Sequence, residues 1–147
     1  MIRLNLPEYQ FKIQRKDDAK LYIYDELRKK NVVLTPEEWV RQNFIQYMNL
    51  EKGIPLSMMV IEKEIELNSL KKRIDLLIYD KNRLPFLIVE CKAPHIKINQ
   101  DTFDQTARYN LTVNAPFLVI TNGLEHYYSA IDLQEKTTKF LKDFPPY

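Results

Sequence analysis

The sequence predicts an α/β fold in which a mixed β-sheet is flanked by helices. Residues 73–79 and 84–90 are rich in apolar and β-branched side chains, and the polar segment 80–83 between them is turn-prone, so together they predict an antiparallel hairpin. A helix predicted over residues 101–113 then leads to another apolar strand at residues 116–121. Because a helical crossover returns the chain in its original direction, the second hairpin strand and the strand after the helix are expected to be parallel.

The first helix has the clearest start and end signals in the chain. Thr35 is a favourable N-cap, Pro36 suits the first helical position, and Glu38 completes a capping box three residues after Thr35. Gly53 marks the end of the run. Between these limits the apolar residues recur at helical spacing, at Trp39, Val40, Phe44, Ile45 and Met48.

Further strands are predicted on both sides of these elements. A strand at residues 58–67 precedes the hairpin, and another at residues 125–128 follows the last apolar strand. Two short strands at residues 9–13 and 20–24 lead into a polar segment at residues 25–31 that shows little chemistry. We expect the N-terminal strands to form an edge hairpin or arm that packs on the sheet or on a partner subunit.

Length and composition indicate one folded domain. The chain has 147 residues, of which 45% are hydrophobic and 29% charged, so it can bury a substantial core and is not disordered. The Pro145-Pro146 pair indicates a frayed C-terminus. Within this one domain we separate an N-terminal arm over residues 1–34, a core over residues 35–130 and a C-terminal tail over residues 131–147.

Charge and cysteine content exclude several classes of protein. A net charge of +2 is too small to indicate nucleic-acid binding, so such a role depends on where the charges lie. Cys91 is the only cysteine, which excludes an internal disulfide, and no Cys/His spacing indicates a zinc site. The sequence has neither a secretory signal nor a run of about 18 apolar residues, so we expect a cytoplasmic protein without a membrane span.

Two acidic residues and a lysine are brought together by the predicted hairpin. Asp75 lies on its first strand, and folding back places Asp75 opposite the end of the second strand, where Glu90 and Lys92 lie. Residues two apart in a strand face the same side, so Glu90 and Lys92 project together while Cys91 points into the core. Carboxylate oxygens for a hard cation, with an amine beside them, are what metal-assisted phosphodiester cleavage requires.

The surrounding sequence adds a resemblance to this pattern. Five blocks occur in order, at residues 35–42, 72–75, 89–94, 104–110 and 121–123. They resemble the restriction-endonuclease-like nuclease superfamily with its D…(D/E)xK signature, and more narrowly the N-terminal nuclease region of type I restriction enzyme R subunits. The resemblance covers about two thirds of the chain. It implies a restriction-endonuclease-like fold, a mixed β-sheet flanked by helices.

The resemblance also implies an activity, a metal and a catalytic set. It implies a nuclease that hydrolyses DNA phosphodiester bonds, with endonuclease action expected and exonuclease action left open. Asp75, Glu90 and Lys92 would be catalytic, and Asp75, Glu90 and Glu38 would hold Mg²⁺, for which Mn²⁺ is the expected substitute. A lysine beside two carboxylates is expected to keep its proton, so stabilisation of charge on the phosphate is favoured over general-base action for Lys92.

The second helix matches a further family pattern. Nucleases of the exonuclease branch carry a Gln-x-x-x-Tyr helix near the site, and Gln105 and Tyr109 match it. Residues four apart share one helix face. The resemblance implies that Gln105 bonds near Lys92 or a substrate phosphate and that Tyr109 touches the strand backbone.

The identity of the helix carboxylate is ambiguous. Glu38 occupies the family's metal-site position, but its place after Thr35 also makes it a capping-box residue, and Glu37 could supply either function. Glu62 and Glu64 lie on the strand before Asp75, and one of them could lie near the site.

Other functions remain open at this point. A catalytically inactive DNA-binding or scaffold module of a restriction or repair complex is the alternative, and RNA is an alternative substrate. No phosphate-loop motif occurs, so the chain would be a stand-alone domain, a fragment or a subunit that awaits a partner. The expected partners are DNA and other restriction-system subunits, and a homodimer is left open.

Overall fold

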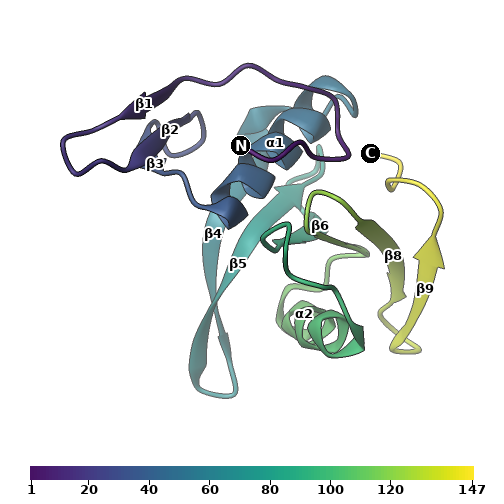
Figure 1. The fold of residues 1–147 in the computed structure, drawn as a ribbon. Coiled ribbons are helices and arrows are strands. Elements are labelled where there is room, and N and C mark those ends of the chain that lie inside the picture. The colour runs from purple at the N-terminus through teal and green to yellow at the C-terminus, as the bar shows by residue number, and fades with distance from the viewer.

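The computed structural model of the protein describes residues 1–147 and contains two β-sheets and two α-helices (Figure 1). The strands of the larger sheet are, in spatial order, β4 (Met59–Leu67), β5 (Leu70–Tyr79), β6 (Pro85–Cys91), β7 (Phe117–Thr121), β8 (His126–Asp132) and β9 (Thr137–Leu141). The smaller sheet, which projects from one side of the molecule in Figure 1, contains β1 (Ile13–Arg15), β2 (Leu21–Asp25) and β3 (Lys30–Val33). The helices are α1 (Pro36–Leu50) and α2 (Gln100–Val113), and a short 3₁₀ helix, η1 (Leu56–Met58), precedes β4.

The topology of the larger sheet confirms the predicted α/β arrangement. Neighbouring strands are antiparallel except for β6 and β7, which are parallel, with Leu87 opposite Phe117 and Cys91 opposite Thr121. The crossover between these two strands is α2, as the sequence predicted. The hairpin of β5 and β6 is also confirmed. The sheet is therefore mixed for the reason that the sequence indicated.

The helix α1 begins and ends close to its predicted limits. The Thr35 hydroxyl accepts a hydrogen bond from the Glu38 N–H at 3.1 Å, which satisfies one free donor of the first turn. The reciprocal half of a capping box is not formed, because the Thr35 N–H donates to the carbonyl of Val33. Gly53 has a φ of +69°, which lets the chain turn so that the Ile54 N–H reaches the Met48 carbonyl.

The two helices cover opposite faces of the sheet. Val40 and Phe44 of α1 share a buried cluster with Leu87, whereas Phe103 of α2 shares a second cluster with Ile88. Because adjacent strand residues face opposite sides, Leu87 and Ile88 show that each helix has its own face. Full burial of side chains of this size stabilises the fold by about 1.5–3 kcal/mol each. These two cores hold the strands of the site between the helices.

The N-terminal sheet differs from the predicted arm. β1 begins four residues later than predicted and β2 one residue later, and a third strand, β3, overlaps the segment at residues 25–31 for which no strand was predicted. β3 is almost fully exposed, so it tolerates polar side chains that argue against a buried strand. The turn before it is built by Asp25, whose carboxylate accepts the Leu27 N–H at 2.8 Å, and by Lys29, with a φ of 53°.

The prediction of a frayed C-terminus was wrong. β8 continues to Asp132, and β9 pairs with it in antiparallel register. Beyond β9, Phe144 is buried in the α1-side core, with its ring 6.3 Å from that of Phe44 and 5.9 Å from that of Tyr128. The Pro145-Pro146 pair cannot form strand or helix hydrogen bonds through its nitrogen atoms. Aromatic packing nevertheless fixes the chain immediately before it.

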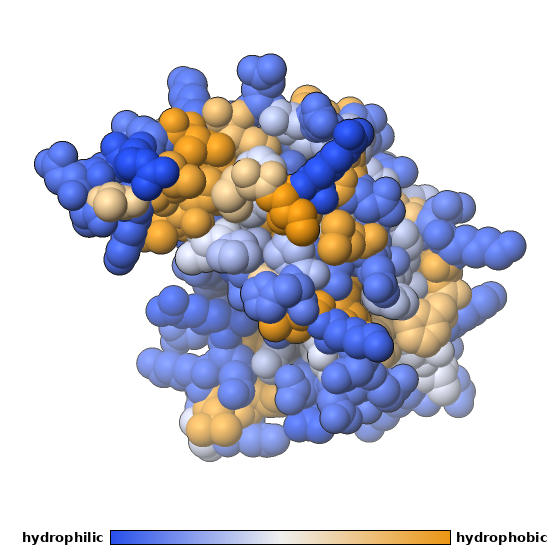
Figure 2. All heavy atoms as spheres, viewed as in Figure 1, coloured by the Kyte–Doolittle hydropathy of each residue, from blue (hydrophilic) through white to orange (hydrophobic).

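The surface is mostly hydrophilic on the face shown in Figure 2, where hydrophobic atoms gather mainly over the N-terminal sheet and the segment beside it. Ile13 and Val33 of that sheet are 41% and 39% exposed. Neither helix combines the length and the apolar character that a membrane crossing requires.

Candidate active site

The candidate site lies where two strands of the large sheet separate. Pairing between β5 and β6 ends at Leu76 and Val89, one residue before Asp75 would meet Glu90. Beyond that point the Asp75 Oδ2 atom accepts the backbone N–H of Cys91 at 2.7 Å. The carboxylate therefore takes the place of a ladder hydrogen bond, and it joins the two strands at the point where they diverge.

The alternation of side chains between the two faces of β5 is interrupted at Asp75. Ile74 is buried in the α2-side core and Leu76 in the α1-side core, although residues two apart in a regular strand face the same side. Pairing with β4 also passes from Ile61–Leu76 to Lys63–Ile74 and omits Glu62 opposite Asp75. Glu62 has a φ of 54°, a left-handed conformation that is uncommon for residues other than glycine. The side chain of Asp75 is thereby released from the alternation of the sheet.

Glu90 and Lys92 project together, as predicted. The Lys92 Nζ atom lies 3.4 Å from Glu90 Oε1. Between them Cys91 is fully buried in the α1-side core, where burial raises the pKa of its thiol, so its predicted core position is confirmed. The Lys92 N–H donates to the Thr121 carbonyl at 2.8 Å and continues the β6–β7 pairing by one residue. The backbone thus fixes the point from which the Lys92 side chain extends.

The carboxylate of Glu90 is mostly buried, and Lys92 is its ion-pair partner on one oxygen only. Its Oε2 atom is buried and has no hydrogen-bond partner. Burial first, and then repulsion from Asp75, raise the pKa of Glu90 to about 7, although Lys92 opposes this shift. A carboxylate in this state would be stabilised by a further positive charge, because desolvation and the neighbouring carboxylate both disfavour its ionised form.

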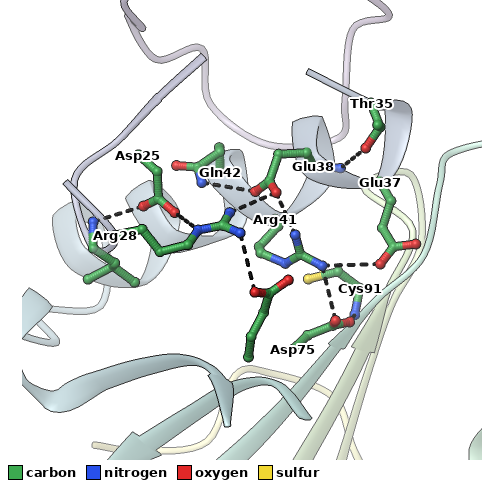
Figure 3. Close-up of polar contacts among 11 residues, drawn as sticks. Asp25, Arg28, Thr35, Glu37, Glu38, Arg41, Gln42, Asp75 and Cys91 are labelled. Atoms are coloured by element: carbon green, nitrogen blue, oxygen red, sulfur yellow. Dashed lines mark hydrogen bonds and ion pairs between the residues drawn. The ribbon is translucent and has the colours of Figure 1, made fainter. Parts of the chain in front are cut away.

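Arg41 of α1 is a site residue that the sequence did not reveal. Its Nη2 atom donates to Asp75 Oδ1 at 3.0 Å and to Glu37 Oε1 at 3.1 Å, and its Nη1 atom donates to Glu38 Oε1 at 2.7 Å (Figure 3). Burial works against its charge, but the carboxylates of Asp75 and Glu38 outweigh burial and raise the pKa of the guanidinium. One signal was present: Arg41 lies three residues before Phe44, on the apolar stripe of the helix.

The two candidate helix glutamates occupy different environments. Both oxygens of Glu38 are engaged: Oε1 accepts from Arg28 and Arg41, each at 2.7 Å, and Oε2 accepts from Gln42 at 3.0 Å. Glu37 is about half exposed, with 46% of its side chain accessible, and its pKa is raised by burial and then by Asp75. The structure therefore brings Glu37, and not Glu38, beside Asp75 with accessible carboxylate surface. Metal binding by Glu38 stays a prediction that its bonds disfavour.

Gln105 and Tyr109 of α2 match the family pattern but form no hydrogen bond with the site. Gln105 is exposed and Tyr109 is half-buried, and no hydrogen bond joins either of them to Lys92 or to a strand. The buried residues of α2 are instead Phe103, Thr106 and Asn110. The expected contacts of Gln105 and Tyr109 within the protein are therefore not made, and their role toward substrate stays a prediction.

The sequence and the fold of this chain both match known proteins. The family profile described as the type I restriction enzyme R protein N terminus (HSDR_N) matches residues 36–145. The chain belongs to this family. A solved fragment described as an HsdR subunit of a type I restriction enzyme from Vibrio vulnificus YJ016 has a similar fold, with a TM-score of 0.52 and 20% identity over 76% of this chain. The chain spans 24% of the length of that fragment. The comparison with curated proteins found no match.

The block at residues 121–123, which is part of the resemblance to R subunits, stabilises a turn and a loop. The Asn122 amide donates to the Ile96 carbonyl at 2.9 Å, and its oxygen accepts from the N–H groups of Leu124 and Glu125. It thereby holds the loop that follows Lys92 against the β7–β8 turn. Gly123 has a φ of +86°, and a Cβ atom there would lie 2.6 Å from a Leu4 methyl carbon, so the turn favours glycine on two grounds.

The residues present fit a hard divalent cation held by two carboxylates. No group of three or more histidine, cysteine or acidic side chains is arranged to hold a metal. Mg²⁺, however, is commonly bound through one or two carboxylates together with water and substrate phosphate. Asp75 and Glu90 supply such oxygens, and the partnerless Oε2 atom of Glu90 is a free ligand position. A surface cavity of about 540 Å³ between α2 and the β8–β9 turn contains none of these residues.

Proposed function

We propose that this chain is a Mg²⁺-dependent nuclease domain that hydrolyses DNA phosphodiester bonds within a type I restriction system. One observation carries the proposal: Asp75, Glu90 and Lys92 converge where β5 and β6 separate, and Glu90 is left with a buried, partnerless oxygen. Membership in the R-protein family supports the restriction role. Nuclease activity, the metal and endonuclease action are the proposed part.

Each residue has a distinct task in this proposal. Asp75 and Glu90 would hold Mg²⁺, which when bound supplies a Lewis acid and an activated water. The Cys91 N–H and Arg41 orient the carboxylate of Asp75 by binding one oxygen each. Lys92 places a positive charge beside the phosphate, where it stabilises negative charge that develops during cleavage. Its ion pair with Glu90 holds Nζ on the same side as the metal ligands.

The surroundings of the site suit a polyanionic substrate. Lys71, Lys72 and Arg73 are exposed on β5 just before Asp75, and Lys97 is exposed in the loop after Lys92. Basic side chains at these positions favour phosphate contacts on either side of the cleavage point. DNA, and not RNA, is proposed because the family description is that of a restriction enzyme.

Cleavage of supercoiled plasmid DNA by the purified chain tests the proposal. We expect nicking or linearisation with Mg²⁺ or Mn²⁺, none with EDTA, and none with Asp75→Asn. Glu66→Gln is the matched control and should cleave like the wild type, because Glu66 is an exposed carboxylate without a bonded partner on β4, the strand that pairs with β5. Equal cleavage by Asp75→Asn and wild type would overturn the proposal. An RNA of the same sequence, tested in parallel, reports the substrate class.

An inactive DNA-binding or scaffold module is the second candidate. Arg41 favours it, because this guanidinium already neutralises Asp75, which is one of the two proposed metal ligands, and Glu37 beside it. DNA binding without cleavage under Mg²⁺, Mn²⁺ and Ca²⁺, with the same affinity in Lys92→Ala, would support this candidate. Metal-dependent cleavage by the wild type would exclude it.

A further inference from the structure

Residues before the family match contribute directly to the buried surroundings of the site. The profile of the R-protein family begins at residue 36, yet Arg28, in the turn between β2 and β3, donates from Nη2 to Glu38 Oε1 at 2.7 Å. The Nε atom of Arg28 bonds to Asp25, the last residue of β2, whose side chain is fully buried. The N-terminal sheet is therefore tied to α1 through charged groups in the interior.

These contacts continue without interruption to the proposed metal ligand. Glu38 Oε1 accepts from both Arg28 and Arg41, and Arg41 in turn donates to Asp75. Acidic and basic groups thus alternate from the N-terminal sheet to the diverging strands, as Figure 3 shows. We call this set, Asp25, Arg28, Glu38, Arg41 and Asp75, the ion chain.

We propose that the N-terminal sheet is a positioning element of the active site, and that Arg28 sets the orientation of Asp75 through Glu38 and Arg41. This inference rests on the nuclease function proposed above. Arg28 touches neither Asp75 nor Glu90, so it is a positioning residue and not a catalytic one.

The competition among carboxylates for Arg41 explains how Arg28 acts at a distance. Arg41 is shared by Glu37, Glu38 and Asp75. While Arg28 neutralises part of the charge on Glu38, the planar Arg41 fork can extend Nη2 to Asp75 with Nη1 still on Glu38. Without Arg28, Glu38 would draw Arg41 more strongly, and the Arg41–Asp75 bond would weaken. Asp75 would then keep only the Cys91 N–H as a fixed partner.

Arg28 also reaches the strand that pairs with Asp75. Its Nη1 atom lies 3.6 Å from Glu62 Oε2. Glu62 is the residue that would stand opposite Asp75 in β4, where the pairing is interrupted and the backbone has a positive φ. A left-handed conformation at such a residue is strained and persists where its surroundings impose it. Arg28 therefore acts on Asp75 from two directions, through α1 and through β4.

Burying the charged groups of the ion chain is costly, which supports the view that their role is to position Asp75 and not to stabilise the fold. The side chains of Asp25, Glu38 and Arg41 are at most 8% exposed, and those of Arg28 and Asp75 are 16% and 14% exposed. Buried ion pairs contribute little net stability compared with apolar side chains of similar size. The charge-assisted hydrogen bonds within them are directional, so they restrict the orientation of the groups that they join. The ion chain gives Asp75 a fixed direction that an apolar contact would not give.

The test compares substitutions along the ion chain with a matched one outside it. Arg28→Lys keeps the charge but loses the paired contacts, and Asp25→Asn removes the far end of the chain. Arg15→Lys is the control, because Arg15 lies in the same sheet and bonds only to the Ala19 carbonyl in its own turn. For each protein, Mn²⁺ affinity is measured by calorimetry, DNA affinity in Ca²⁺, the single-turnover cleavage rate in Mg²⁺, and the melting temperature.

We expect Arg28→Lys to lower both the Mn²⁺ affinity and the single-turnover rate by about tenfold or more, with DNA affinity within about twofold of the wild type. Asp25→Asn should change the same two quantities in the same direction, and Arg15→Lys should change neither. A merely structural role would lower only the melting temperature. Wild-type Mn²⁺ affinity and rate in folded Arg28→Lys and Asp25→Asn would overturn the inference.

A double-mutant cycle tests the route through Glu38. If Arg28 acts through Glu38, Arg28→Lys combined with Glu38→Gln should lower Mn²⁺ affinity little more than Glu38→Gln alone. Fully multiplicative effects would contradict that route. Failure of the nuclease function can be distinguished from failure of this inference. If the wild type binds Mn²⁺ but cleaves no DNA, the nuclease function is wrong, and the differences in Mn²⁺ affinity among the variants still test the positioning role of Arg28. A wild type without Mn²⁺ binding overturns both.

Discussion

The two helices that flank the candidate site serve it in different ways. On α1, Glu37, Glu38 and Arg41 are joined to one another, and Arg41 is joined to Asp75. On α2, Gln105 is exposed and Tyr109 half-buried, and neither is bonded to a site residue. The α1 side is therefore fixed by bonds inside the protein, whereas Gln105 and Tyr109 of α2 make no such bonds.

This difference suggests a division of labour. The α1 side, with the N-terminal sheet behind it, orients the carboxylates before any ligand binds, and such preorganisation lowers the cost of forming a reactive complex. On α2, Gln105 and Tyr109 have unbonded polar groups, which we expect to be available to substrate. Substitutions on the two helices should consequently affect different properties: stability and metal affinity on α1, and substrate affinity on α2.

The largest effect is expected from Arg41→Met. This substitution leaves Asp75 and Glu38 buried with fewer counter-charges, which typically costs about 3–5 kcal/mol of stability. Arg108→Met on α2 is the matched control, because Arg108 is exposed and should lie within about 0.5 kcal/mol of the wild type. Urea denaturation measures both. An Arg41→Met protein within about 1 kcal/mol of the wild type would show that the α1 side is not held by this residue.

Lys92→Ala should lower the single-turnover cleavage rate on the order of a hundredfold, because one preorganised charge beside the phosphate is lost. Mn²⁺ affinity should persist or increase, since the two carboxylates lose a competing cation, and Lys92→Arg should restore activity only in part. Lys139→Ala, at an exposed position of β9 away from the site, serves as the control. Full activity of Lys92→Ala would remove Lys92 from the catalytic set.

Glu90 gives a prediction for pH. Its pKa is about 7 in the folded protein against an ordinary 4.5, so the folded state binds this proton more tightly than the unfolded state. The stability that the protonated group contributes is present below about pH 4.5 and is lost as pH rises through 7. Each pKa unit corresponds to about 1.4 kcal/mol, and loss of the Lys92 contact offsets part of the gain. Without metal, Glu90→Gln should therefore be more stable than the wild type by about 2 kcal/mol at pH 8.

The comparison is made by urea denaturation of metal-free wild type and Glu90→Gln at pH 4 and pH 8. The difference in unfolding free energy should be small at pH 4 and large at pH 8, and Glu66→Gln should show no such dependence. A difference that is independent of pH would contradict the assigned environment of Glu90.

The smallest effects on stability are expected on α2. Gln105→Ala should change the unfolding free energy by less than about 0.5 kcal/mol. If the side chain meets substrate, it should weaken DNA binding in Ca²⁺ by about two- to tenfold, the value of one neutral hydrogen bond. Gln134→Ala, an exposed glutamine in the β8–β9 turn, is the control for both measurements. Unchanged DNA affinity in Gln105→Ala would mean that α2 does not present this residue to substrate.

The same contrast explains what the sequence could and could not predict. The hairpin of β5 and β6, the inward direction of Cys91 and the shared side of Glu90 and Lys92 follow from alternation and a local turn, which are properties of neighbouring residues. The parallel β6–β7 pair follows from the helical crossover. Each of these could be predicted without knowing any distant partner.

The partners of Arg41 and Arg28 could not be predicted in this way. Arg41 meets Asp75 from 34 positions away, and Arg28 meets Glu38 across the start of α1. An arginine on an apolar helix stripe indicates that some buried acid is near, but several carboxylates could satisfy it. The prediction that Glu38 binds the metal did not take account of Arg28 and Arg41, because their pairing with Glu38 depends on the tertiary structure. The burial of Phe144 likewise depends on rings from other elements.

The most direct test of the account is a crystal of the wild-type protein soaked in Mn²⁺ and examined by anomalous scattering. We predict a peak within about 2.5 Å of carboxylate oxygens of both Asp75 and Glu90, with Arg41 still bonded to Asp75 Oδ1. A peak bound elsewhere, or none at millimolar Mn²⁺ with Glu90 Oε2 still partnerless, would contradict the claim that the diverging strands form a metal-dependent nuclease site.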